Sequence, residues 1–232
     1  MATDEGRRTR TELSEASLHA LDSRVSIPGY DRAALGSGIV HIGVGGFHRA
    51  HQAVYLDDLC RRGETDWSIT GAGVLPADGA MAEALAAQDH LYALVTRDAR
   101  TTEVSVIGSI TDYVLAANDP EPLVARLAAP ETRVVSLTVT EGGYPLDETS
   151  GELAITPGEP LPPAFEAMAL AFARRRDAGR VGLTVQSCDN VMGNGDATRA
   201  VTLGVCALVE PGLEAWVAEN VTCLLYTSDA AD

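Results

Sequence analysis

One short segment near the start of the chain constrains the fold more than any other feature. Residues 38–42 form an apolar run around His41, and Gly43, Gly45 and Gly46 follow at once. The run predicts a buried strand, and the glycines predict a tight turn into a helix over residues 47–62. This order is typical of the place where a dinucleotide pyrophosphate binds, because glycines let phosphates approach the backbone and a helix start attracts negative charge. His48 stands where the third glycine of that fingerprint belongs, so a plain tight turn is an alternative.

The rest of the chain alternates between predicted strands and predicted helices. Strands are expected at 67–74, 91–96, 104–110 with a continuation at 113–115, 133–139 and 181–186. Helices are expected at 78–88, 119–127, 163–176, 197–209 and 212–221, with a long surface loop over 145–163. This alternation predicts an α/β fold with a doubly wound, mostly parallel sheet over residues 38–222. A lead-in over 1–37, with a short amphipathic helix, precedes it.

The charge of the chain argues against several partners. The formal net charge is −16, so the phosphate backbone of a nucleic acid would be repelled. All 17 basic residues are Arg, so no lysine amine of this chain takes part in chemistry. No apolar run approaches the length of a membrane span, and the polar N-terminus does not resemble a signal peptide. We therefore expect a cytoplasmic protein that binds neither nucleic acid nor membrane.

The cysteines and histidines do not predict a metal site. Cys60, Cys188, Cys206 and Cys223 lack metal-ligand spacing and are expected to be reduced thiols. His48 and His51 are three residues apart, but no acid or thiol nearby completes a ligand set, so packing under the glycine turn is the better interpretation.

An acidic residue at the end of the second strand would bind the ribose hydroxyls of NAD. Asp78 is the nearest candidate, a few residues after the predicted strand end at Val74. Starting the next helix is its alternative role.

Three spaced motifs resemble those of the polyol-specific long-chain dehydrogenases, the mannitol dehydrogenase family. The first is the glycine turn continued to Gln52, and the second is the segment 138–144. The third is the segment 187–190 followed by 194–196. The resemblance covers residues 24–222, and residues 25–52 are most similar to the mannitol-oxidising members.

The resemblance implies an NAD-dependent oxidoreductase with a Rossmann-like fold and no metal. It would interconvert a small polyol and a ketose, with mannitol and fructose as the expected pair and NADP left open as cofactor. The cofactor-binding residues it implies are Gly43, Val44, Gly45, Gly46, Phe47, Asp78, Thr140 and Glu141. For Glu141, a solvated loop position is an alternative.

Asn190 resembles a catalytic asparagine of the family, whose amide stabilises the developing alkoxide. A turn residue after a strand is its alternative role. The family's lysine base, second asparagine and histidine belong to a helical C-terminal domain. The chain is therefore expected to be a fragment, inactive by itself, of an enzyme that is monomeric when intact.

Residues 223–232 depart from the family and are similar to translated sequencing-adapter DNA, so we expect them not to be biological. Two rival functions stay open. One is a fructuronate or tagaturonate reductase of the same family, and the other is a non-catalytic nucleotide-binding module. A methyltransferase would share the glycine turn but not the second and third motifs.

Overall fold

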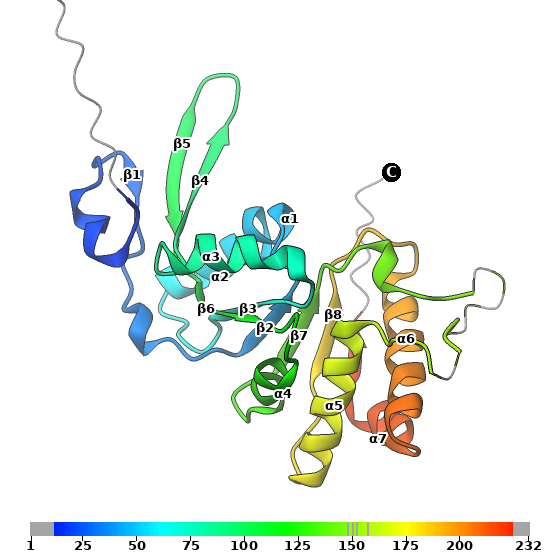
Figure 1. Ribbon diagram of the computed structural model, residues 1–232. Coiled ribbons are helices and arrows are strands. Elements are labelled where there is room, and N and C mark those ends of the chain that lie inside the picture. Colours follow the sequence, from blue (N-terminus) through cyan, green and yellow to red (C-terminus); the bar gives the residue numbers. More distant parts are fainter. Residues whose placement is uncertain (1–11, 148, 150, 152, 157, 225–232) are drawn as a thin grey trace, which may run out of the picture.

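The computed structural model describes residues 12–147, 149, 151, 153–156 and 158–224 (Figure 1). Within these residues a six-stranded parallel sheet forms the centre of the molecule. Across the sheet its strands are β6 (Ile110–Leu115), β3 (Ile69–Gly73), β2 (Ile39–Ile42), β7 (Val134–Leu137), β8 (Thr184–Ser187) and β9 (Thr222–Leu224). Numbered by their order along the chain, they run 3-2-1-4-5-6, which is the Rossmann order. The predicted doubly wound fold is confirmed.

Helices cover both faces of this sheet (Figure 1). One face carries α1 (Gly46–Ala50), α2 (Gln52–Arg61) and α3 (Gly79–Ala86), and the other carries α4 (Glu121–Ala128), α5 (Pro163–Asp177), α6 (Asn194–Val209) and α7 (Leu213–Asn220). All four residues of β2 are buried because the strand has helices on both sides. Its side chains alternate, so Ile39 joins one apolar cluster while Val40 and Ile42 join the other.

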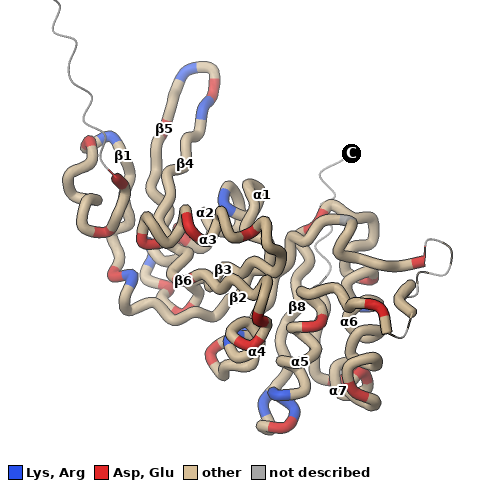
Figure 2. Tube along the Cα trace, in the orientation of Figure 1, with Lys and Arg blue, Asp and Glu red and all other residues tan. Residues whose placement is uncertain are grey.

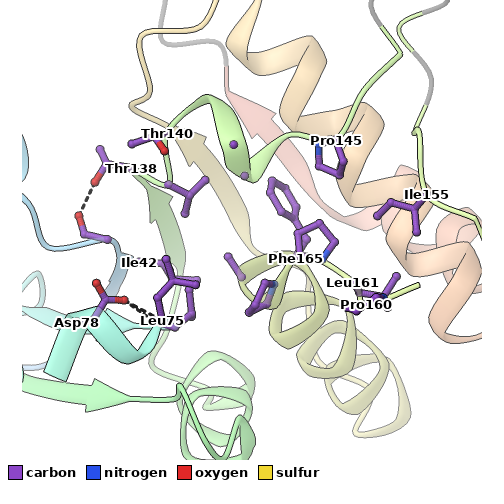
Figure 3. A pocket seen from close by; sticks show the side chains of 18 of the residues that line it. Ile42, Leu75, Asp78, Thr138, Thr140, Pro145, Ile155, Pro160, Leu161 and Phe165 are labelled. Atoms are coloured by element: carbon purple, nitrogen blue, oxygen red, sulfur yellow. Dashed lines mark hydrogen bonds between the residues drawn. The ribbon is translucent and has the colours of Figure 1, made fainter. Parts of the chain in front are cut away.

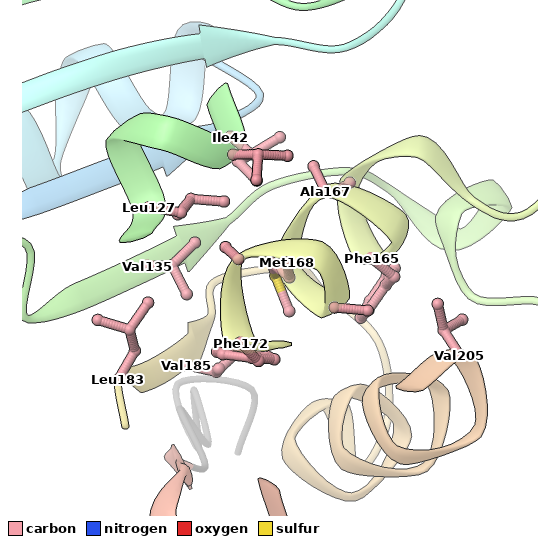
Figure 4. Packing of buried hydrophobic residues seen from close by; sticks show 14 of the residues in the cluster. Ile42, Leu127, Val135, Phe165, Ala167, Met168, Phe172, Leu183, Val185 and Val205 are labelled. Carbon is pink, nitrogen blue, oxygen red and sulfur yellow. The ribbon is translucent and has the colours of Figure 1, made fainter. Parts of the chain in front are cut away.

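Helix α5 supplies much of the larger cluster (Figure 4). It begins at Pro163, which needs no hydrogen-bond acceptor in the first turn. Phe165, Met168 and Phe172 recur at helical spacing and are fully buried, packed against strand residues such as Val135 and Val185. The last turn carries Arg174–Arg176 at the negative end of the helix dipole.

A second, three-stranded sheet stands apart from the central one. It consists of β1 (Val25–Ser26), β5 (Thr102–Ile107) and β4 (Tyr92–Arg97), with β4 and β5 forming an antiparallel hairpin. The prediction that strand 104–110 continues through 115 was wrong, because the chain passes from one sheet to the other at Gly108 and Ser109. A Cβ on Gly108 would lie 2.9 Å from Pro28 and 3.0 Å from the Tyr30 hydroxyl, so the lead-in packs closely against this crossing.

Polar contacts attach the described part of the lead-in to the domain. Arg32 is buried and donates to the carbonyl oxygens of Gly108 (2.9 Å) and Ile110 (2.8 Å). The Tyr30 hydroxyl donates to the buried carboxylate of Asp57 on α2. The predicted amphipathic helix is a 3₁₀ turn, Glu15–Ala20, with no buried residue.

The structure differs in detail from two further predictions, one about the helix after the glycine turn and one about the end of the domain. The helix predicted over 47–62 is interrupted at His51, which separates α1 from α2. The proposed boundary after residue 222 falls inside β9, where Thr222 and Cys223 pair with Thr184 and Val185. Residues 225–232 lie outside the described residues, so the origin assigned to this segment stays a prediction.

Charged residues are spread over the surface, with basic residues concentrated at the hairpin tip and at the end of α5 (Figure 2). None of the helices in the described part of the chain is both long enough and apolar enough to cross a membrane.

Candidate functional site

The glycine turn lies at the carboxyl end of β2. Gly43 has a positive φ of 95°, and its N–H donates to the carbonyl of Ala72 in the neighbouring strand (2.9 Å). Gly45 is the N-cap of α1, and Gly46 is the first residue of this helix. The predicted strand–turn–helix arrangement is therefore present.

The three glycines of this turn have different surroundings. A Cβ on Gly43 would lie 2.1 Å from the carbonyl oxygen of Thr138, in the turn after β7. A Cβ on Gly45 would meet only the Gly43 oxygen at 3.8 Å, and one on Gly46 would meet nothing within 4 Å. Gly43 is therefore fixed by packing within the chain, whereas Gly45 and Gly46 border open space.

Val44 and Phe47 point to different environments. The Val44 side chain is buried in the smaller apolar cluster, so only its backbone lies at the turn. Phe47 is 51% exposed and contacts the His51 ring at 4.7 Å.

A cavity of about 840 Å³ opens between the glycine turn and the ends of β3 and β7 (Figure 3). One wall comes from the ends of the three strands and includes Ile42, Gly43, Leu75, Asp78, Thr138 and Thr140. The opposite wall comes from the loop before α5 and its first turn, and includes Pro145, Ile155, Pro160, Leu161 and Phe165. Strands β2 and β7 are neighbours at the point where the strand order reverses. After β2 the chain adds β3 and β6 on one side of the sheet, and after β7 it adds β8 and β9 on the other side. Ligands of doubly wound sheets bind in the crevice at this point.

Asp78 lies on the rim of this cavity, after β3. Its Oδ2 accepts the backbone N–H groups of Val74 and Leu75, both at 2.9 Å. The carboxylate thus closes the turn that leads from β3 into α3, and it also lines the cavity.

Two stacked histidines lie beneath the glycine turn. The rings of His41 and His48 are 3.5 Å apart and nearly parallel. His41 hydrogen-bonds Ser136 Oγ (2.8 Å) and Thr138 Oγ1 (3.0 Å), and His48 Nδ1 lies 2.9 Å from Gln52 Oε1. Burial lowers the pKa of His41 well below its usual value and lowers the pKa of His48 to about 4. Both rings are therefore neutral at pH 7.

Thr140 and Glu141 follow β7 and begin the next turn. Thr140 lines the cavity and has a φ of 63°, a left-handed conformation that costs a non-glycine residue about 1 kcal/mol. Glu141 begins the 3₁₀ turn Glu141–Gly143, but its side chain lies outside the described part of the structure.

Asn190 is exposed and follows β8 in the third motif. It is not one of the residues that line the cavity, but its neighbour Asp189 reaches the β7 turn. Asp189 Oδ1 accepts the N–H of Thr140 (2.8 Å), and Oδ2 accepts the N–H of Val139 (3.1 Å). The second and third motifs therefore meet at the end of the sheet.

Four residues that shape this site were not predicted from the sequence, namely His41, Thr138, Tyr144 and Asp189. Thr138, Tyr144 and Asp189 stand inside the two later motifs, which was the available signal. Among the described residues no three His, Cys, Asp or Glu side chains are grouped closely enough to hold a metal ion.

Comparison with known proteins fits this geometry. The family model of the mannitol dehydrogenase Rossmann domain matches residues 37–229. The chain belongs to the mannitol dehydrogenase family. A mannitol 2-dehydrogenase of Cereibacter sphaeroides is 46% identical over 206 residues, which are 85% of this chain and 43% of that protein. A mannitol 2-dehydrogenase of Pyricularia oryzae is 40% identical over 210 residues, which are 85% of this chain and 42% of that protein.

Solved structures of the family agree with the fold. A Pseudomonas fluorescens mannitol 2-dehydrogenase in a ternary complex with NAD and D-mannitol has a TM-score of 0.86 and 41% identity. The match covers 92% of this chain and 46% of that one. A D-sorbitol dehydrogenase in substrate-free form has a TM-score of 0.83 and 37% identity, over 91% of this chain and 46% of that one. The chain thus spans less than half the length of these relatives.

Proposed function

We propose that this chain is the cofactor-binding part of an NAD-dependent polyol dehydrogenase that interconverts mannitol and fructose. The cavity at the ends of β2, β3 and β7, lined by Gly43 of the glycine turn and by Asp78, is the observation that carries the proposal. The similarity to a mannitol 2-dehydrogenase solved with NAD and D-mannitol supports both the cofactor and the first substrate to test.

The residues around the cavity fit the chemical groups of NAD. Gly45 and Gly46 present backbone without side chains, so a pyrophosphate can approach the first N–H groups of α1 closely. Asp78 on the rim would accept the hydroxyl groups of the adenosine ribose. The same carboxylate would repel the 2′-phosphate of NADP, so we expect a preference for NAD.

The bound nicotinamide would exchange a hydride with the carbinol carbon of the polyol. Thr140 and the turn that follows it would form the floor beneath the nicotinamide. Asn190 would donate its amide N–H to the alkoxide oxygen as charge develops there. A neutral amide suits this role because it donates without titrating. A lysine base would come from the region of the relatives that this chain does not span, since the chain itself contains no lysine.

Cofactor binding is tested by titrating the chain with NADH and following fluorescence, with NADPH and S-adenosylmethionine as competitors. Gly46→Ala is the diagnostic variant, because its Cβ meets none of the described residues within 4 Å but would occupy the space of the pyrophosphate. We expect NADH binding to weaken at least tenfold while the unfolding temperature is unchanged or slightly higher.

Gly29→Ala is the matched control, because its Cβ also meets nothing within 4 Å but lies in the lead-in. It should bind NADH as the wild type does. Equal NADH affinity in wild type and Gly46→Ala would show that the glycine turn is not part of the cofactor site. A wild-type chain that prefers S-adenosylmethionine would reject the dehydrogenase altogether.

Substrate and chemistry are tested in a chimaera. Residues 37–222 of this chain replace the matching region of the Cereibacter sphaeroides relative, so that the remainder of that protein is supplied. We expect NAD-dependent oxidation of mannitol, lowered at least a hundredfold in kcat by Asn190→Ala with NADH affinity retained. Reduction of fructuronate without oxidation of mannitol would instead favour the reductase alternative.

A further inference from the structure

The carboxylate of Asp189 is the centre of a buried hydrogen-bond network that joins the turns after β7 and β8. Asp189 is 8% exposed. Beside the N–H groups of Thr140 and Val139, it accepts the hydroxyl of Tyr144 at 2.7 Å. Three donors thus converge on one carboxylate, and all three belong to the turn after β7.

The turn that Asp189 holds has a conformation that needs support. Thr140 is left-handed and borders the cavity, where we propose that the nicotinamide binds. A strained residue of this kind persists when surrounding contacts fix it. The bonds from Thr140 and Val139 to the carboxylate are contacts of that kind, and they direct both N–H groups toward Asp189.

Tyr144 completes the network from the other end of the turn. Its hydroxyl lies 3.0 Å from Ser187 Oγ, and its ring packs edge-on against Phe165. Burial raises the pKa of Tyr144 above its usual value, and the bond to Asp189 raises it further. The phenol therefore keeps its proton and remains a donor to the carboxylate.

The backbone around Asp189 is fixed as well. Its carbonyl oxygen accepts from the side-chain amide of Asn194 at 3.0 Å, at the start of α6. Asn190, the proposed donor to the alkoxide, lies between these two anchored residues. The position of Asn190 is thus tied to the same network that holds Thr140.

We propose that Asp189 is a positioning residue that fixes the turn beneath the nicotinamide and the backbone of Asn190 as one unit. This inference rests on the proposed function. An acid is needed at this position because a carboxylate offers only acceptors to its three donors. An asparagine would place its own NH₂ group against at least one of these three donors. That hydrogen bond would be lost, and the turn after β7 would no longer be held in one conformation.

Asp189→Asn is the test variant, and Asp98→Asn is the matched control. Asp98 also accepts two backbone N–H groups in a turn, those of Arg100 and Thr101, but it lies at the hairpin tip. Tyr144→Phe removes one donor and keeps the ring. Two readouts are taken on the 232-residue chain. One is NADH affinity by fluorescence titration, and the other is hydrogen–deuterium exchange over residues 138–144.

We expect Asp189→Asn to weaken NADH binding about tenfold and to speed exchange in this segment, with β2 as protected as in wild type. Tyr144→Phe should shift both readouts less and in the same direction, and Asp98→Asn should shift neither. Faster exchange with unchanged NADH affinity would make Asp189 merely structural and overturn the proposal, as would unchanged exchange. Failure of the wild-type chain to bind NADH would refute the proposed function, and this inference with it.

Discussion

The stacked histidines beneath the glycine turn make the stability of the fold sensitive to acid. His48 is only 1% exposed, and its Nε2 has no hydrogen-bond partner in the described part of the structure. Protonation would add an N–H at that buried nitrogen with no acceptor for it. Burial is the main reason why the pKa of His48 is lowered, and the positive charge of Arg49 lowers it further.

The sign and size of the effect follow from this pKa. His48 titrates at about 4 in the folded chain and near 6.5 when unfolded, so between these values the unfolded chain binds the extra proton. The stabilising contribution of neutral His48 to the free energy of unfolding is therefore fully present above pH 6.5. It is lost progressively as the pH falls toward 4. A shift of this size, at about 1.4 kcal/mol per unit, lowers the free energy of unfolding by about 3 kcal/mol at pH 4.

The measurement compares the wild type with His48→Asn by urea unfolding from pH 7 to pH 4, followed by tryptophan fluorescence. Asparagine can retain the contact with Gln52 but does not titrate. Its absolute stability at pH 7 is expected to be lower, because the ring contact with His41 is lost. The decisive quantity is the decrease in the free energy of unfolding from pH 7 to pH 4. This decrease should be about 3 kcal/mol smaller in the variant than in the wild type.

His51→Asn is the control for this measurement, because it removes an exposed ring that already contacts water in the folded chain. Its acid loss should equal that of the wild type. Equal losses in wild type and His48→Asn would refute the reasoning and show that protonated His48 is accommodated without cost. His48 also lowers the pKa of the stacked His41, so the difference between wild type and His48→Asn reports the acid sensitivity of the histidine pair.

Two further substitutions test the packing around the site and the lead-in. Gly43→Ala forces a Cβ against the Thr138 carbonyl at a residue with positive φ, and it should lower the free energy of unfolding by about 4 kcal/mol, measured by urea unfolding. A loss below about 1 kcal/mol would show that the turn can move aside. Asp57→Ala leaves the Tyr30 hydroxyl, the Gly108 N–H and the Arg61 guanidinium without their buried acceptor, so it should cost about 3–5 kcal/mol. The neighbouring exposed Asp58→Ala is the control, and equal losses in the two variants would contradict the anchoring role of Asp57.

The sequence predicted the features that depend on local pattern. The apolar run at 38–42 and the glycines after it are local signals, and β2, Gly43 and α1 are where they were expected. The alternation of strands and helices, together with the right-handed crossover rule, leaves few arrangements other than the observed sheet. The family motifs added the segments after β7 and β8, which carry little periodic signal.

The features that sequence did not reveal depend on contacts between distant residues. His41 meets Ser136 and Thr138 because β2 and β7 are neighbours in the sheet. Asp189 meets Thr140 because β7 and β8 are neighbours. The chain passes between the two sheets at Gly108, where the distant Pro28 and Tyr30 of the lead-in pack closely.

The glycine turn shows why such a motif is both a good and an incomplete predictor. Gly43 is required by the fold, since its Cβ would overlap the Thr138 carbonyl whether or not a cofactor binds. Gly45 and Gly46 border open space, so the fold alone does not require them, and the space they leave is what a ligand would use. A sequence shows three similar glycines, and only the contacts separate Gly43, which packs against the turn after β7, from Gly45 and Gly46, which border open space. The same distinction separates Asp189, which would act through the turn it holds, from Asn190, which would act on the substrate itself.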